Sequence, residues 1–148
     1  MTLPKATVVH SLAEARRAMA SARKTGRAIT LLSARGAALF AGCLWWREMI
    51  AIVRDEYPDV AMVDVLDCAD DTAQAWAAVR IGLRHLVLER ARTVPTHDPH
   101  DTVEGPGAPA VHGQTKPALV ALAPDIDALR AVALARGVTL LLRRPEHD

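Results

Sequence analysis

The chain has 148 residues, with 18 lysines and arginines, 17 aspartates and glutamates, and a net charge of +1. This balance excludes the broad positive field that attracts nucleic acid or an anionic membrane surface, so we expect neither as a partner. The length suits a single domain, residues 1–148, that buries about two-thirds of the surface its unfolded form exposes.

Cysteine usage and the absence of targeting signals bear on the compartment. Cys43 and Cys68 lie inside apolar segments and have neither the number nor the spacing of a disulfide framework or a zinc site. This pattern favours a reducing compartment, so we expect a cytoplasmic protein without a bound metal. Met1 to His10 lacks the layout of a secretory signal. The apolar stretches also end well before the roughly twenty residues that a membrane span requires.

The first predicted unit is strand, helix, strand. A short β-branched strand covers Ala6 to Val9, and Ser11 with Glu14 forms a capping box that begins a helix. Apolar residues recur on one face of this helix, which ends at Gly26. The next strand, Ala28 to Leu32, is apolar on both faces, as expected for a strand covered by helices.

The middle of the chain repeats this alternation. A helix is predicted from about Gly42 to Glu56, because its apolar residues share one face and Pro58 prevents its continuation. A strand follows, and Asp70 or Asp71 then caps the next helix. The remaining predicted elements are the strand Val60 to Leu66, the helix to Gly82, and the strand His85 to Leu88.

The alternation is interrupted from Arg90 to Lys116, where prolines, glycines and histidines occur without an apolar period. We interpret this stretch as a long loop or insertion, and loops of this length tend to be functional or mobile. The alternation then resumes. The predicted elements there are a strand over Ala118 to Ala123, a helix capped by Asp125 and ending at Gly137, and a strand over Val138 to Leu142.

A strand–helix–strand unit therefore occurs three times, over Ala6 to Leu32, Ala61 to Leu88 and Leu119 to Leu142. Such units predict an α/β fold with an open, mainly parallel sheet of five or six strands and about four helices. A sheet covered on both faces, as in Rossmann-like or flavodoxin-like folds, is the first expectation, and a half-barrel is the alternative. Five mid-strand residues are expected to be buried: Val8, Leu31, Val65, Val87 and Leu141.

Polar residues follow several predicted strands. Because the carboxyl ends of parallel strands meet at one edge of the sheet, beside helix N-termini, ligands of open parallel sheets bind there. The same polar residues could instead cap helices and end the core. The candidate ligand-binding residues are His10, Ser33, Arg35, Gly36, Asp67 and Arg143, with Glu89 and Arg144 at the same edge.

The turn Ser33 to Gly36 offers a place for an anion. A small loop ahead of a helix exposes backbone N–H groups at the positive end of the helix dipole, and Arg35 adds a positive charge. An ordinary strand-to-helix turn explains the same residues, and the turn matches neither established phosphate-binding motif. Asp67 lies near Asp70 and Asp71, and these three carboxylates could bind a divalent cation, although caps and a strand end explain them as well.

Cysteine and histidine chemistry is less favoured. Cys68 lies near a predicted helix start, where a thiolate can be stabilised, but a small buried hydrophobe is its usual role and also that of Cys43. Metal-ligating residue types gather in the long loop, where no rigid scaffold supports them, and we interpret them as solvated. These residues are His97, Asp98, His100, Asp101 and His112.

Trp45 and Trp46 are neighbours on a predicted helix, about 100 degrees apart around its axis, so both cannot point to the centre of one core face. One is expected at the periphery, where it could mark a protein interface or pack beneath the long loop. With 51% hydrophobic residues in a small domain, the pair indicates a homodimer.

The sequence contains no catalytic or cofactor motif of accepted specificity, so no cofactor is expected. The first functional hypothesis is an accessory or interaction protein that associates with itself, or with a protein partner, through the helix surface around Trp45 or Trp46. The alternative is a small enzyme or binding protein for an anionic metabolite, carrying phosphate or carboxylate, at the strand ends. That alternative depends on analogy from architecture.

Overall fold

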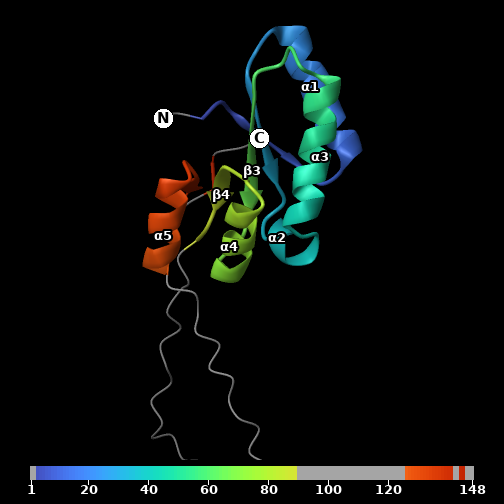
Figure 1. Ribbon diagram of the computed structural model, residues 1–148. Coiled ribbons are helices and arrows are strands. Elements are labelled where there is room, and N and C mark those ends of the chain that lie inside the picture. The colour runs from blue at the N-terminus through green and yellow to red at the C-terminus, as the bar shows by residue number, and fades with distance from the viewer. Residues whose placement is uncertain (1–2, 90–125, 142–143, 146–148) are drawn as a thin grey trace, which may run out of the picture.

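A computed structural model describes residues 3–89, 126–141 and 144–145 (Figure 1). The described residues form five strands and five helices. The strands are β1 (Ala6–Val9), β2 (Ile29–Ser33), β3 (Met62–Asp67), β4 (His85–Val87) and β5 (Thr139–Leu141). The helices are α1 (Leu12–Thr25), α2 (Ala37–Phe40), α3 (Cys43–Glu56), α4 (Thr72–Arg80) and α5 (Ile126–Ala135).

The five strands form one open sheet in the order β1-β2-β3-β4-β5, and every neighbouring pair is parallel. The predicted open parallel sheet is therefore confirmed. Its order has no reversal, which corrects the first expectation of a Rossmann-like or flavodoxin-like sheet covered on both faces and corresponds to the half-barrel alternative. Each crossover connection in such a sheet has the same handedness and adds the next strand at the same edge. The helices of these connections therefore lie on the same face of the sheet.

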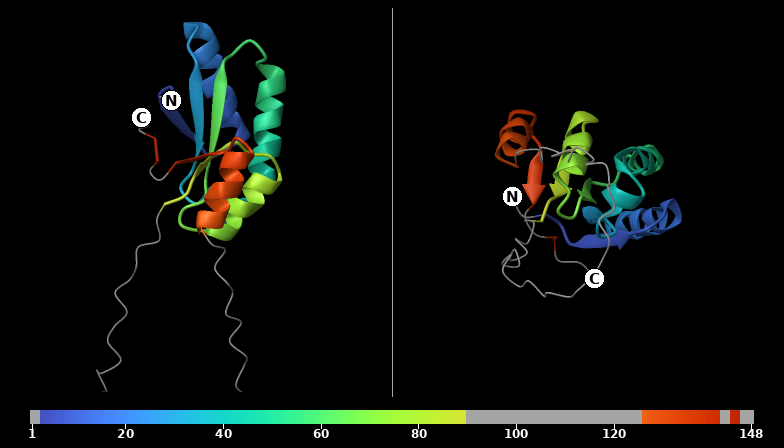
Figure 2. Two further views of the ribbon diagram at one scale, coloured as in Figure 1. Left: turned by 60° about the vertical axis from the view of Figure 1, so that its left-hand side comes forward. Right: turned by 90° about the horizontal axis from the view of Figure 1, so that it is seen from below.

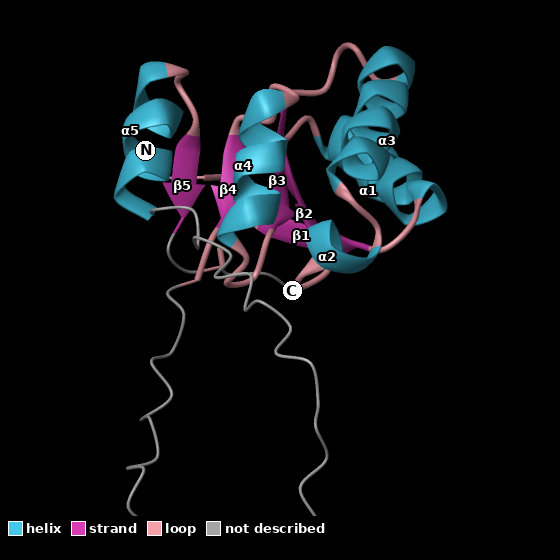
Figure 3. Cartoon of the chain, turned by 60° about the horizontal axis from the view of Figure 1, so that its bottom comes forward, coloured by secondary structure: helices cyan, strands magenta, loops and turns pink. Residues whose placement is uncertain are grey.

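The helices accordingly cover one face of a curved sheet (Figures 2 and 3). The core on that face combines helix and strand residues, including Met19, Trp46 and Leu86. A second, smaller cluster on the other face contains residues of strands and of the segment before β1, and no helix residue. It consists of Ala6, Leu32, Val65 and Val87, with Leu3, Val8, Val63 and Leu141 packed against them.

Burial of the predicted mid-strand residues follows their place in the sheet. Leu31, Val65 and Val87 are fully buried, as predicted. Val8 and Leu141 are only half-buried. They belong to β1 and β5, the two outer strands of the described sheet, so each has a neighbouring strand on one side only.

Local signals explain where the long helices begin and end. The Ser11 hydroxyl accepts the Glu14 backbone N–H at 3.2 Å at the start of α1, and Gly26 ends it with a left-handed φ of 63°. Asp71, one of the two predicted caps, accepts the Gln74 N–H at 2.9 Å at the start of α4. The short helix α2 was not predicted, because four residues are too few for an apolar period.

Several sequence predictions lie outside the described residues. They are the loop from Arg90 to Lys116 with its histidines, the strand over Ala118 to Ala123, and the cap at Asp125.

Among the described residues, no helix has the length and apolar character needed to cross a membrane.

Leu31 provides a test of the core. Its side chain is fully buried in the middle of β2. Replacing Leu31 by alanine should lower the free energy of unfolding by about 2 to 4 kcal/mol, through lost transfer energy and a cavity. Urea denaturation measures the change. Leu134→Ala, at a residue of α5 that is 81% exposed, is the control and should change stability by less than about 0.5 kcal/mol.

Candidate functional site

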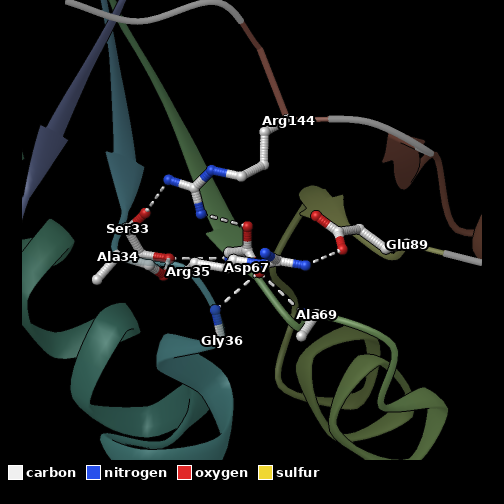
Figure 4. A network of polar contacts seen from close by, with 8 residues as sticks. All are labelled: Ser33, Ala34, Arg35, Gly36, Asp67, Ala69, Glu89 and Arg144. Carbon is white, nitrogen blue, oxygen red and sulfur yellow. Dashed lines mark hydrogen bonds and ion pairs between the residues drawn. The ribbon is translucent and has the colours of Figure 1, made fainter. Parts of the chain in front are cut away.

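Polar residues converge at the carboxyl ends of β2, β3 and β4, where the sequence places candidate ligands (Figure 4). The convergence brings together four segments that are far apart in the chain: the turn after β2, the end of β3 with Ala69, Glu89 after β4, and Arg144. We call this group the strand-end network. Its eight members are Ser33, Ala34, Arg35, Gly36, Asp67, Ala69, Glu89 and Arg144.

Asp67 is the centre of the strand-end network. Its side chain is fully buried, and its Oδ1 accepts the backbone N–H groups of Gly36 at 2.8 Å and Ala69 at 2.9 Å. Its Oδ2 forms an ion pair with the guanidinium of Arg144. The buried carboxylate is thus matched by one positive charge and three hydrogen-bond donors, which is the condition under which burying a charge is tolerated.

Arg144 connects β3 to β2. Its second nitrogen, Nη2, donates to the Ser33 carbonyl at 3.1 Å. The Ser33 hydroxyl accepts the Asp67 backbone N–H at 2.9 Å and donates to the Ala34 carbonyl at 3.0 Å. Ser33 and Asp67 therefore hold each other in place while Arg144 spans both strands.

A second ion pair lies at the exposed margin of the strand-end network. Arg35 donates to the Glu89 carboxylate at 2.6 Å, and the Arg35 side chain is 70% exposed. The Glu89 backbone N–H donates to the Ala69 carbonyl at 2.7 Å. Ala69 has a left-handed φ of 49°, a conformation that costs an L-residue about 1 kcal/mol or more. In this conformation its N–H bonds to Asp67 and its carbonyl to Glu89.

In this geometry, the groups of the Ser33 to Gly36 turn that could bind an anion interact with carboxylates of the same chain. The Gly36 N–H, which the sequence offers to an anion, donates to Asp67, and Arg35 is paired with Glu89. The helix that follows Gly36 is the four-residue α2, so it has only a small dipole. The predicted anion site therefore has its donor and its charge engaged by carboxylates of the protein itself.

The other predicted site residues lie apart from the strand-end network or outside the described residues. His10 is exposed and pairs with Glu14, whose carboxylate accepts the His10 backbone N–H at 2.7 Å. Arg143 lies outside the described residues, whereas its neighbour Arg144 provides the guanidinium. Asp71 is a helix cap and Asp70 is exposed. No group of three or more potential metal ligands occurs within the described part of the chain.

The two cysteines are buried and unpaired. Burial raises the pKa of the Cys68 thiol well above its usual range, and the neighbouring Cys43, Asp67 and Asp71 add to the effect. Burial also raises the pKa of Cys43. Both residues therefore resemble small core hydrophobes rather than nucleophiles, because the reactive species is the thiolate.

The two adjacent tryptophans differ in burial, as the helix geometry predicts. Trp46 is fully buried in the core and Trp45 is 36% exposed, with ring centroids 6.1 Å apart. Trp45 joins three other exposed apolar side chains at the junction of α2 and α3, and we call these four residues the α2–α3 patch. The patch consists of Leu39, Phe40, Leu44 and Trp45. Sequence reasoning missed its first three members, whose signal is large apolar residues at the end of α2 and the start of α3.

Comparison with known proteins found no matching protein-family model and no similar curated protein.

Asp67 can be tested against Glu89, because both carboxylates hold an arginine in the same network. Asp67→Asn should destabilise the protein by about 3 kcal/mol, since it leaves Arg144 largely buried without its counter-charge. Glu89→Gln, the matched control, breaks a pair whose arginine is exposed and should cost less than about 1 kcal/mol. Urea denaturation measures both changes. Equal losses would show that Asp67 is not the main polar anchor of the strand ends.

Thiol chemistry gives an independent test of burial. In the folded protein at neutral pH, Cys43 and Cys68 should react with an aromatic disulfide reagent much more slowly than in guanidinium chloride, because both thiols are buried and protonated. Alkylation followed by peptide mass mapping distinguishes the two residues. Rapid labelling of Cys68 in the folded state would contradict this account and revive its interpretation as a nucleophile.

Proposed function

We propose that this protein is an accessory protein that acts by association, and that it forms a homodimer through the α2–α3 patch. The observation that carries this proposal is the exposure of large apolar side chains there: Leu39 is 51%, Phe40 72% and Leu44 56% exposed. Single exposed apolar residues are ordinary on protein surfaces, but contiguous groups of them mark interaction sites. Aromatic residues such as Phe40 and Trp45 are also enriched at interfaces.

A second copy is the partner that suits the α2–α3 patch best. Apolar side chains need no partner of opposite charge, so the patch can pack against itself around a twofold axis. The adjacent polar residues on α3, Arg47 and Glu48, have opposite charges and are paired with each other. Because these two charges neutralise each other, the edge of the patch does not repel the same edge of a second copy.

The alternative function, binding or conversion of an anionic metabolite at the strand ends, remains a prediction. Among the described residues at that edge, the guanidinium groups that could bind the anion belong to Arg35 and Arg144. Both are engaged by carboxylates of the chain, Glu89 and Asp67. An anionic ligand would have to compete with these carboxylates, and this competition is why we favour association.

Solution mass tests the homodimer. The wild-type protein should have a dimer mass by light scattering at micromolar concentration. Phe40→Asp or Trp45→Asp should weaken dimerisation by about 2 kcal/mol or more, roughly thirtyfold in dissociation constant, because an aromatic anchor is lost and a charge is buried. Phe40 is 72% exposed in the single chain, so the variant should keep the wild-type circular dichroism spectrum and remain folded as a monomer.

Leu134→Asp is the matched control for these variants. Leu134 is 81% exposed on α5 and is not part of the α2–α3 patch, so this variant should remain a dimer. A wild-type monomer at high micromolar concentration, or equal dissociation of the Leu134 and Phe40 variants, would contradict the proposal.

A further inference from the structure

A pocket of about 340 Å³ opens between α3 and the turn that joins α4 to β4. Residues of α3 at helical spacing form one side of it, and the turn before β4 forms the other. Its volume lies at the small end of the range for small-molecule sites. The lining residues are Arg47, Ile50, Ala51, Arg54, Asp64, Gly82, Leu83 and Arg84.

The side of the pocket formed by the turn has a fixed backbone. The Leu83 N–H donates to the Ala78 carbonyl at 3.1 Å, and the Arg84 carbonyl accepts the Thr139 N–H at 2.6 Å. The Leu83 side chain is also buried in the core. The turn is therefore tied to α4 and to β5, and the Arg84 side chain extends from a backbone that is held on both sides.

The lining residues carry more positive than negative charge, because three arginines accompany one acidic residue, Asp64. Arg54 donates from Nη2 to the Asp64 carboxylate at 2.6 Å, and the Asp64 side chain is 12% exposed. This hydrogen bond uses one of the five N–H donors of a guanidinium. The Asp64 carboxylate therefore orients Arg54 and leaves donors for a second anion.

The other two arginines of the pocket are also accessible to an anion. Arg84 is exposed and forms no ion pair with any described residue. Its guanidinium extends toward Gly137, where an added Cβ atom would lie 4.0 Å from Nη1. Arg47 pairs with Glu48, but both side chains are exposed, and exposed pairs contribute little stability. In the strand-end network, by contrast, each arginine has a carboxylate of its own.

We propose that this pocket binds the phosphate group of a small phosphate monoester. Arg54 and Arg84 bind the phosphate oxygens from opposite sides, Arg84 after rotation about its side-chain bonds, and Arg47 adds positive charge. Guanidinium groups suit this role because their forked donors match phosphate oxygens. Ile50 and Leu83 offer an apolar surface to the organic part of the ligand.

This proposal is independent of the homodimer. The pocket shares no residue with the α2–α3 patch. Arg47 lies at the edge of that patch, so variants of Arg54 and Arg84 test the pocket without changing the dimer interface.

Phenyl phosphate is a suitable probe, because it joins a phosphate dianion to a small apolar group. Titration calorimetry should show saturable binding that weakens with added salt and is tighter than the binding of inorganic phosphate. Arg84→Gln should weaken binding roughly tenfold, through loss of a charge-assisted hydrogen bond. The matched control, Arg17→Gln, removes the same charge from an exposed arginine outside the pocket and should retain the affinity.

Arg54→Lys tests the forked donors of Arg54 while keeping a positive charge beside Asp64. The lysine ammonium can still pair with Asp64, so the variant should remain folded, which thermal melting checks. It lacks the planar fork, so its affinity for phenyl phosphate should fall by a factor comparable with that of Arg84→Gln.

Three outcomes would overturn the proposal: no saturable binding of phenyl phosphate up to millimolar concentration, equal loss of affinity in the Arg84 and Arg17 variants, or equal affinity for inorganic phosphate and phenyl phosphate. The last outcome would assign the pocket to the free ion. Tighter binding of a phosphoserine peptide than of phenyl phosphate would identify a protein segment as the ligand and would also overturn it.

Discussion

The arrangement of the strand ends depends on one buried charge, the Asp67 carboxylate at the end of the central strand β3. An isolated carboxylate in the core would cost several kcal/mol, so it is accommodated only with donors around it. Gly36, Ala69 and Arg144 supply these donors, from the turn after β2, the loop after β3 and the residues beyond β5. One side chain therefore fixes three segments relative to each other, and the hydrophobic core could not do so because it is non-directional.

The strand order determines which surfaces the fold leaves for binding. A sheet whose order reverses has a crevice at the switch point, and ligands bind there. This sheet follows chain order without reversal, so its described part has no such crevice. It has instead a helix-covered face, an opposite face with a small apolar cluster, and an outer strand, β1, whose outer side pairs with no described strand. In the described part of the chain, the surfaces that this strand order leaves are thus faces of helices and of the sheet.

The elements could be predicted from sequence because their causes are local. Ser11 and Gly26 bound α1, and the apolar face of α3 contains Trp46 and excludes Trp45 from the core centre. Strand order could not be predicted, because the repeated strand–helix unit is the same in doubly covered and singly covered sheets. Nor does any local pattern distinguish Arg143 from Arg144 as the partner of Asp67, 77 residues away from Arg144, since only the path of the backbone decides which guanidinium reaches the carboxylate.

The buried carboxylate also links the interior to the α2–α3 patch. Asp67 holds the N–H of Gly36, and Gly36 has a left-handed φ of 66° at the start of α2. The helix that begins there has only four residues and cannot be stable on its own, because nucleating a helical turn is costly. The hydrogen bond from Gly36 to Asp67 and the buried residues Ala37 and Ala38 therefore fix the position of α2, which carries Leu39 and Phe40. Preorganisation of this kind would reduce the entropy cost of the association that we propose.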